Sequence, residues 1–210
     1  MKTVRVLLTL LLLLGILSVV FLTDIPTFMR IKRGQIKDYN TVTAGELQVN
    51  DPVRGTVEMT IGACAEKKKN SSSTTEYYVL WMPNNRFILY ETGKKDDITT
   101  LNRMCDEAGK YLKSLGKAKE ESNPAAVILP ETKMEFEGVV AKPSGTVMDY
   151  FREYYSQVFG TDDFDQYAEV VMISQRALSS FNGTVIAGLI CAALFVILAV
   201  VTIILYRKAD

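Results

Sequence analysis

The feature that most constrains the fold is an apolar run near the C-terminal end of the chain. It spans residues 185–205, VIAGLICAALFVILAVVTIIL, and contains no charged side chain. A helix of 21 residues is about 31 Å long, close to the hydrocarbon thickness of a bilayer. Tyr206, Arg207 and Lys208 follow it, as aromatic and basic residues do at a membrane surface. The run therefore predicts a transmembrane helix.

A second apolar run lies at the other end, in residues 6–22, after Lys2 and Arg5. Secretory signal peptides also begin with a basic segment and an apolar stretch. This run is longer than a usual signal, and residues 22–26, LTDIP, contain no small-x-small cleavage site. We therefore expect an uncleaved signal anchor, with a cleaved signal peptide as the alternative. The predicted organisation is an anchor in residues 1–29, a domain in 30–176, and a second transmembrane helix with a short basic tail in 177–210.

The composition between the two runs excludes several functions. Residues 25–176 contain 20 basic and 22 acidic side chains, and the chain has no histidine. This balance lacks the basic surface of a nucleic-acid-binding protein. Without histidine there can be no Ser-His-Asp triad, Cys-His pair or histidine metal ligand. The sequence predicts no cofactor and no metal site.

Alternating apolar and polar residues predict strands in the domain. The longest pattern covers residues 53–65, followed by a solvated loop in 66–76. Residues 77–82 and 86–91 predict a hairpin joined by a turn at 83–85, and two further strands are expected in 134–140 and 167–174. Gly55 and Gly138 lie within strands, which is typical of a bend or bulge.

Two segments have helical spacing of apolar residues. The first covers residues 98–115, with Gly116 as its expected end, and the second covers 146–159. The expected fold class is α+β, with two helices and either a curved, antiparallel-rich sheet or a small OB-like barrel.

Cysteines and small residues supply the candidate sites. Cys64 and Cys105 are a candidate disulfide pair in an oxidising compartment; a packed thiol or a reactive thiol at Cys105 are the alternatives. Small residues recur four positions apart in the last apolar run, which lets transmembrane helices approach closely. They are the candidate helix-packing residues Gly183, Ala187, Gly188, Cys191 and Ala192. Their partner would be the first apolar run or a second copy of the chain.

Three functions fit these observations. The preferred one is a non-catalytic, membrane-anchored module that binds a partner protein or assembles a complex at the membrane surface. The second is an accessory subunit of a transporter or channel, acting through the two spans. The third is an enzyme that uses carboxylates, tyrosines, or Cys64 and Cys105; among the carboxylates, Glu135 and Glu137 share one strand face.

Basic residues near the spans do not decide the topology, because four lie in the tails and five on the domain side. Long loops cross membranes largely regardless of charge. We therefore expect both termini in the cytoplasm and the domain outside.

Short motifs accompany this layout: Asp38-Tyr39-Asn40, Val53-Arg54-Gly55-Thr56-Val57 and Tyr77-Tyr78-Val79 between the two spans. With them the chain resembles uncharacterised two-span membrane proteins of Gram-positive bacteria that contain a domain of unknown function. This resemblance implies the plasma membrane of a bacterium and no known activity. The layout is also similar to the domain between two spans in mitochondrial ubiquitin ligases, but no RING sequence follows the second span.

Overall fold

The computed structural model describes residues 2–70, 73–120, 127–161 and 163–207. The chain forms two compact units: Met1–Gln35 together with Ala177–Asp210, and Ile36–Arg176. The fold class is α+β, as the sequence predicts. The described strands form one open sheet, which corresponds to the expected antiparallel-rich sheet and not to the OB-like barrel.

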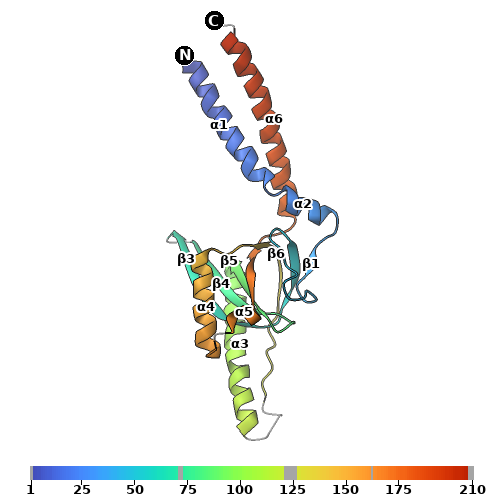
Figure 1. Cartoon of the computed structure of the whole chain (residues 1–210), viewed down its shortest axis with the longest axis vertical. Helices are drawn as coiled ribbons and strands as arrows, with labels where there is room; N and C mark the ends of the chain where they lie inside the picture. The colour runs from blue at the N-terminus through green and yellow to red at the C-terminus, as the bar shows by residue number, and fades with distance from the viewer. Residues whose placement is uncertain (1, 71–72, 121–126, 162, 208–210) are drawn as a thin grey trace. The chain divides into compact units, whose positions relative to one another are not determined.

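The first unit is built from three helices. α1 (Lys2–Leu22) and α6 (Ser180–Arg207) are the two apolar helices, and α2 (Ile25–Lys32) is a short helix that follows α1. Figure 1 shows α1 and α6 side by side in opposite directions, with the N- and C-termini at the same end. Two helical stretches of 27 residues are long and apolar enough to cross a membrane: Val6–Lys32, which includes most of α1 and all of α2, and Ser180–Tyr206, which includes nearly all of α6.

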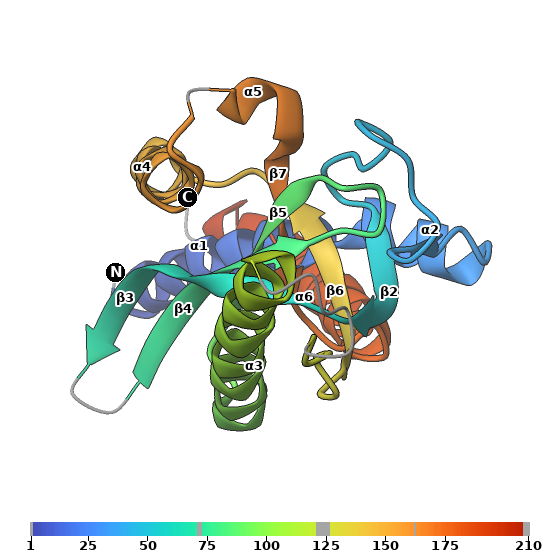
Figure 2. The ribbon, with the colours of Figure 1, turned by 90° about the horizontal axis from the view of Figure 1, so that it is seen from below.

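The second unit contains seven described strands in one sheet. These are β1 (Lys37–Asp38), β2 (Pro52–Val57), β3 (Thr60–Asn70), β4 (Ser73–Trp81), β5 (Phe87–Thr92), β6 (Met134–Ala141) and β7 (Ala168–Gln175). Their order is β1-β2-β6-β7-β5-β4-β3, with β1 parallel to β2, β5 parallel to β7, and the other pairs antiparallel. The sheet is strongly twisted (Figure 2).

Both faces of the sheet are covered. α3 (Lys95–Glu120) packs on one face through Leu101 and Met104, against a core that includes Tyr78 and Ile88. α4 (Gly145–Phe159) and α5 (Phe164–Tyr167) contribute to the core of the other face. Successive residues of a strand point to opposite faces, so the stretches Tyr77–Trp81 of β4 and Phe87–Tyr90 of β5 are aromatic or apolar at every position.

The predicted strand in residues 53–65 is wrong as one element. The chain leaves the sheet at Glu58 and Met59, and β2 and β3 lie toward opposite ends of the strand order. The buried positions also change phase, from Val53 and Val57 to Thr60 and Gly62. The crossing at Glu58 and Met59 accounts for the change, because β3 begins a new alternation at Thr60. The pairing of β3 with β4 is itself irregular between Thr60 and Gly62 and between Ala63 and Ala65.

Two other boundaries differ from the prediction. The expected loop in residues 66–76 is mostly strand, because β3 continues to Asn70 and β4 begins at Ser73; residues 71–72 lie outside the described part. α3 does not end at Gly116 but continues to Glu120. The residues after Gly116 are Lys, Ala, Lys and Glu, all good helix formers that offset the cost of one glycine.

Candidate functional site

A pocket of about 390 Å³ opens where the chain crosses from β2 to β3. We call it the crossover pocket. It lies among the β2–β3 connection, the end of β4, the turn after β4, α3, and residues 127–133, which we call the strap. Its lining residues are Tyr39, Thr56, Glu58, Met59, Trp81, Met82, Pro83, Asn85, Tyr111, Leu129, Pro130 and Lys133. Most of these side chains are aromatic or apolar, which is typical of a binding site that excludes water.

Tyr39 lies at the inner side of the crossover pocket and is only 1% exposed. Its hydroxyl donates a hydrogen bond to the carbonyl oxygen of Trp81 at 3.3 Å, and its ring meets Phe136 edge-on at 5.2 Å. Burial, with a smaller contribution from the charge of Glu58, raises the pKa of Tyr39 far above its ordinary value. The phenol therefore stays protonated and acts as a fixed, neutral wall of the pocket.

The rim of the pocket carries both charges. Lys133 forms an ion pair with Glu58, and both side chains are more than half exposed. Exposed ion pairs of this kind contribute only about 0–1 kcal/mol. A ligand could therefore separate the two groups at little cost and use either charge.

The strap is held against α3 by polar side chains of that helix. The Ser114 hydroxyl accepts a hydrogen bond from the backbone N–H of Ile128 at 2.9 Å. The Glu107 carboxylate accepts from the backbone N–H groups of Glu131 (3.0 Å) and Thr132 (2.8 Å) and from the Thr132 hydroxyl (2.5 Å). The Thr132 hydroxyl and backbone bonds hold the pKa of Glu107 below its ordinary value. The outer wall of the pocket thus depends on an ionised carboxylate.

Exposed apolar side chains lie on α3 and the strap, two of the elements that line the pocket. Leu112 and Leu115 on α3 are 46% and 37% exposed, and Ile128 and Leu129 on the strap are 58% and 70% exposed. Helical spacing places Leu112 and Leu115 in the predicted core stripe, but the C-terminal part of α3 extends past the strands (Figure 1). These four side chains, here called the α3 patch, are therefore not covered by the sheet.

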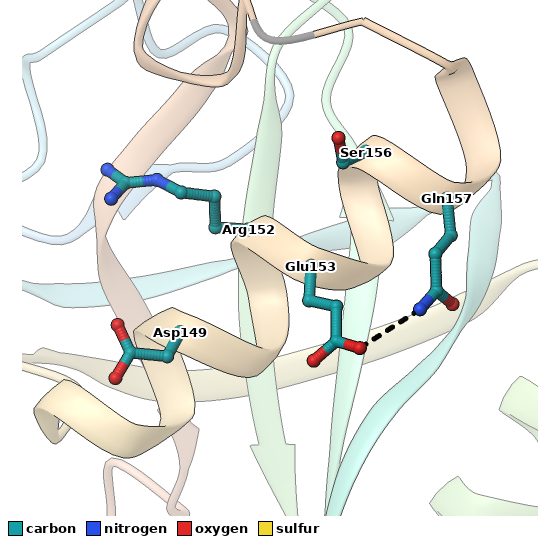
Figure 3. A pocket seen from close by; sticks show the side chains of 5 residues that line it. All are labelled: Asp149, Arg152, Glu153, Ser156 and Gln157. Atoms are coloured by element: carbon teal, nitrogen blue, oxygen red, sulfur yellow. Dashed lines mark hydrogen bonds between the residues drawn. The ribbon is translucent and has the colours of Figure 1, made fainter.

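A second, shallower depression lies on α4. Figure 3 shows its lining side chains, Asp149, Arg152, Glu153, Ser156 and Gln157, along one side of that helix. Gln157 donates to Glu153 at 3.1 Å, and Arg152 bonds Asp165 at 3.0 Å. All five lining residues come from a single helix, so this is a polar surface and not an enclosed site.

The two cysteines of the candidate disulfide are free, half-buried thiols in the structure. Burial raises the pKa of Cys64 to about 12 and that of Cys105 to about 11. Cys64 packs against the core that includes Val79 and Phe151, whereas Cys105 packs against the core that includes Tyr78 and Met104. Thiols with such high pKa values are poor nucleophiles at neutral pH. Pairing of Cys64 with Cys105 under oxidising conditions stays a prediction.

Glu135 and Glu137, the carboxylates considered for an enzyme, both lie exposed on β6. Neither lines the crossover pocket or the depression on α4. Within the described residues there is also no group of three or more Cys, Asp or Glu side chains that could hold a metal ion.

A buried ion pair among the described residues, between Arg86 and Glu169, was not found from the sequence. Arg86 Nε lies 2.7 Å from Glu169 Oε1, and the side chain of Glu169 is 6% exposed. Arg86 also donates to the carbonyl oxygens of Gln166 and Ala168, and Glu169 accepts from the backbone N–H of Gly45 at 3.1 Å. This cluster joins the β4–β5 turn to β7 and to the loop before β2. The two charged residues are 83 positions apart, so no local pattern indicates the pair.

The model of a protein family described as Domain of unknown function (DUF8577) matches residues 2–206. The chain belongs to this family. No curated protein and no solved structure matches the chain. The match extends over both apolar helices and the domain between them, so the family includes the two-helix layout that the sequence predicts.

The apolar helices of this DUF8577 chain pack along a regular seam. The least exposed residues recur at alternating steps of three and four: Leu7, Leu11, Leu14, Ser18 and Phe21 on α1, and Gly188, Cys191, Phe195, Leu198 and Thr202 on α6. This mean spacing of 3.5 residues is the spacing of a coiled-coil seam.

The candidate packing residues differ in their surroundings. A Cβ atom on Gly188 would lie 2.9 Å from the Cβ of Phe21, whereas one on Gly183 would meet no atom within 4 Å. Ala187, Cys191 and Ala192 are half-buried. On α1, Gly15 faces the ring of Phe195: a Cβ atom on Gly15 would lie 3.2 Å from the nearest ring carbon. Of the glycines in α1 and α6, Gly15 and Gly188 are therefore the two at which the helices approach each other most closely.

We expect Gly188→Leu to weaken the pairing of α1 with α6 by about 1–3 kcal/mol, because the added side chain needs space that Phe21 and Leu22 occupy. Gly183→Leu is the matched control, since it adds the same apolar group in open space. A photoreactive phenylalanine analogue at Phe195, cross-linked in a bilayer and mapped to α1 by mass spectrometry, measures the pairing. Equal cross-linking in both variants would contradict the assignment of Gly188 to the seam.

Proposed function

We propose that this protein is a membrane-anchored, non-catalytic module that binds an apolar segment of a partner protein in the crossover pocket and on the α3 patch. The observation that supports it is a half-enclosed aromatic pocket whose lining includes the exposed Leu129, with three further exposed apolar side chains on the same two elements, the strap and α3. Exposed apolar surface beside a pocket is characteristic of protein-interaction sites. Trp81 and Tyr111 supply the large, rigid rings on which interface energy usually depends.

The two ends of the bound segment would meet different surroundings. Inside the pocket, Trp81, Met82 and Tyr111 offer an apolar surface, whereas Glu58 and Lys133 at the rim offer both charges. An apolar segment flanked by a charged residue would match both regions, with its apolar side chains in the pocket and its charge at the rim. A charge of the partner can replace either Lys133 or Glu58 in the weak ion pair at the rim. The displaced side chain is exposed, so no buried charge is left unpaired.

The proposal places both apolar helices across a bilayer. Their length and composition support this, and their antiparallel arrangement brings both termini to one end of the helix pair (Figure 1). We propose that the termini lie in the cytoplasm and the domain outside. The basic residues of the two short tails support this orientation once those of the domain side are given less weight, because long loops cross membranes largely regardless of charge.

The test uses charges introduced on exposed residues, which leave the core intact. Ile128→Glu combined with Leu129→Glu is expected to weaken partner binding at least about tenfold, because each buried leucine-sized side chain contributes about 1.5–3 kcal/mol. Val170→Glu is the control, since Val170 is 68% exposed and lies outside the pocket and the patch.

The partner is captured with a photoreactive residue at Leu129 in the full chain, in membranes of the source organism. A defined protein adduct that forms from Leu129, but not from Val170, is the expected result. Adducts of equal yield from both positions, or none from Leu129, would remove the proposal.

A further inference from the structure

α2 has an arrangement that neither the anchoring nor the pocket explains. The apolar run of α1 ends at Leu22, and α2 begins at Ile25, with Pro26 in its first turn. Figure 1 shows α2 turned across the direction of α1 and α6. Three residues span at most about 10 Å. If α1 crosses a bilayer, α2 therefore begins within the headgroup layer.

The exposed face of α2 combines apolar and basic side chains. Met29 is 41% exposed, and Lys32 and Arg33 are exposed as well, whereas Thr27 is 3% exposed. Met29, Lys32 and Arg33 lie on one side of the helix, since three- and four-residue steps return to the same face. The ammonium of Lys32 lies 5.6 Å from the centre of the Phe28 ring. Met29 thus lies beside cations on one side of α2.

The charges within α2 and at its C-cap are all positive, and Asp24 at the N-cap lies at the other end of the helix. α2 has no acidic residue in its first turn and has Arg30 and Lys32 in its last turn, with Arg33 following as the C-cap. Basic residues at a helix C-terminus interact favourably with the helix dipole. The dipole explains the basic residues but not the exposed apolar side chain of Met29 next to them. Amphipathic helices that lie in a membrane surface have both features.

We propose that α2 binds anionic phospholipids of the leaflet facing the domain, with Met29 in the headgroup layer and Lys32 and Arg33 at the lipid phosphates. This inference rests on the membrane anchoring proposed above. A negatively charged lipid satisfies both cations, and the turn at Thr23 and Asp24 holds the helix parallel to the surface. α2 would then fix the depth and the rotation of the neighbouring span.

The experiment uses the full chain with Met29→Trp, reconstituted in phosphatidylcholine vesicles with and without phosphatidylglycerol. Quenching by lipids brominated near the headgroup is compared with quenching in the parent, whose only tryptophan is Trp81. We expect quenching at position 29 and a preference of roughly fivefold or more for brominated phosphatidylglycerol over brominated phosphatidylcholine, since a basic side chain near an anionic surface changes affinity by about that factor.

Lys32→Glu combined with Arg33→Glu should abolish this preference. Lys67→Glu with Lys68→Glu, a pair of exposed lysines on β3, should leave it unchanged. Absence of quenching at position 29 in a chain that is inserted in the vesicles would overturn the inference, as would a preference that survives the Lys32 and Arg33 changes. A chain that does not insert in vesicles would instead overturn the proposed anchoring.

Discussion

Glu169→Ala is expected to lower the free energy of unfolding of the domain by about 3–5 kcal/mol, because it leaves the partly buried Arg86 guanidinium without its carboxylate. The backbone N–H of Gly45 loses its acceptor at the same time. The measurement is urea unfolding of the full chain in detergent, followed by the fluorescence of Trp81. Trp81 is a good reporter because its ring lies 5.6 Å from that of Phe87, the residue after Arg86.

Lys133→Ala is the matched control for Glu169→Ala. It also breaks an ion pair, but the partner Glu58 is 59% exposed and keeps its water. The expected loss is therefore about 0–1 kcal/mol. Similar losses in the two variants would show that burial does not decide the strength of the Arg86–Glu169 pair.

Gly138→Ala is expected to lower the free energy of unfolding by about 1–3 kcal/mol, because the new methyl group forces β6 and β7 apart. A Cβ atom at this position would lie 2.7 Å from both Ile173 Cγ2 and the carbonyl oxygen of Ser174. The second atom is backbone in the neighbouring strand and cannot turn away. Thermal unfolding followed by circular dichroism measures the loss.

The same substitution at Gly109 should have the opposite sign. Gly109 lies within α3, and a Cβ atom there would meet no atom within 4 Å. Alanine is favoured over glycine by about 1 kcal/mol in a helix interior, so Gly109→Ala should stabilise the domain. If Gly138→Ala also stabilises it, the close approach of β6 and β7 is not required for the fold.

Local patterns were sufficient for the elements whose environment is uniform along their length. Both apolar helices follow from hydropathy alone, and the β4–β5 hairpin follows from two apolar runs around Pro83 and Asn85. α4 begins at Gly145 and ends at Phe159, within one residue of the prediction, because Ser144 caps its start and Gly160 its end.

Patterns failed where the environment changes within an element. The alternation in residues 53–65 hides a crossing between distant strands, because the break at Glu58 and Met59 is only two residues long and the alternation begins again at Thr60. The stripe of α3 includes Leu112 and Leu115, yet the sheet ends before it reaches them. Periodicity shows which residues share a face but not how far the opposing surface extends.

By itself, the sequence determined the two membrane-spanning candidates, the α+β class and the absence of histidine chemistry, since these depend on composition and on spacing within one element. Only the tertiary structure decided the crossover pocket, the Glu107 contacts that hold the strap, and the Arg86–Glu169 pair. Each of these joins residues that are distant in the sequence, and their meeting depends on strand order and register. Loop closure between such segments leaves no periodic trace in the chain.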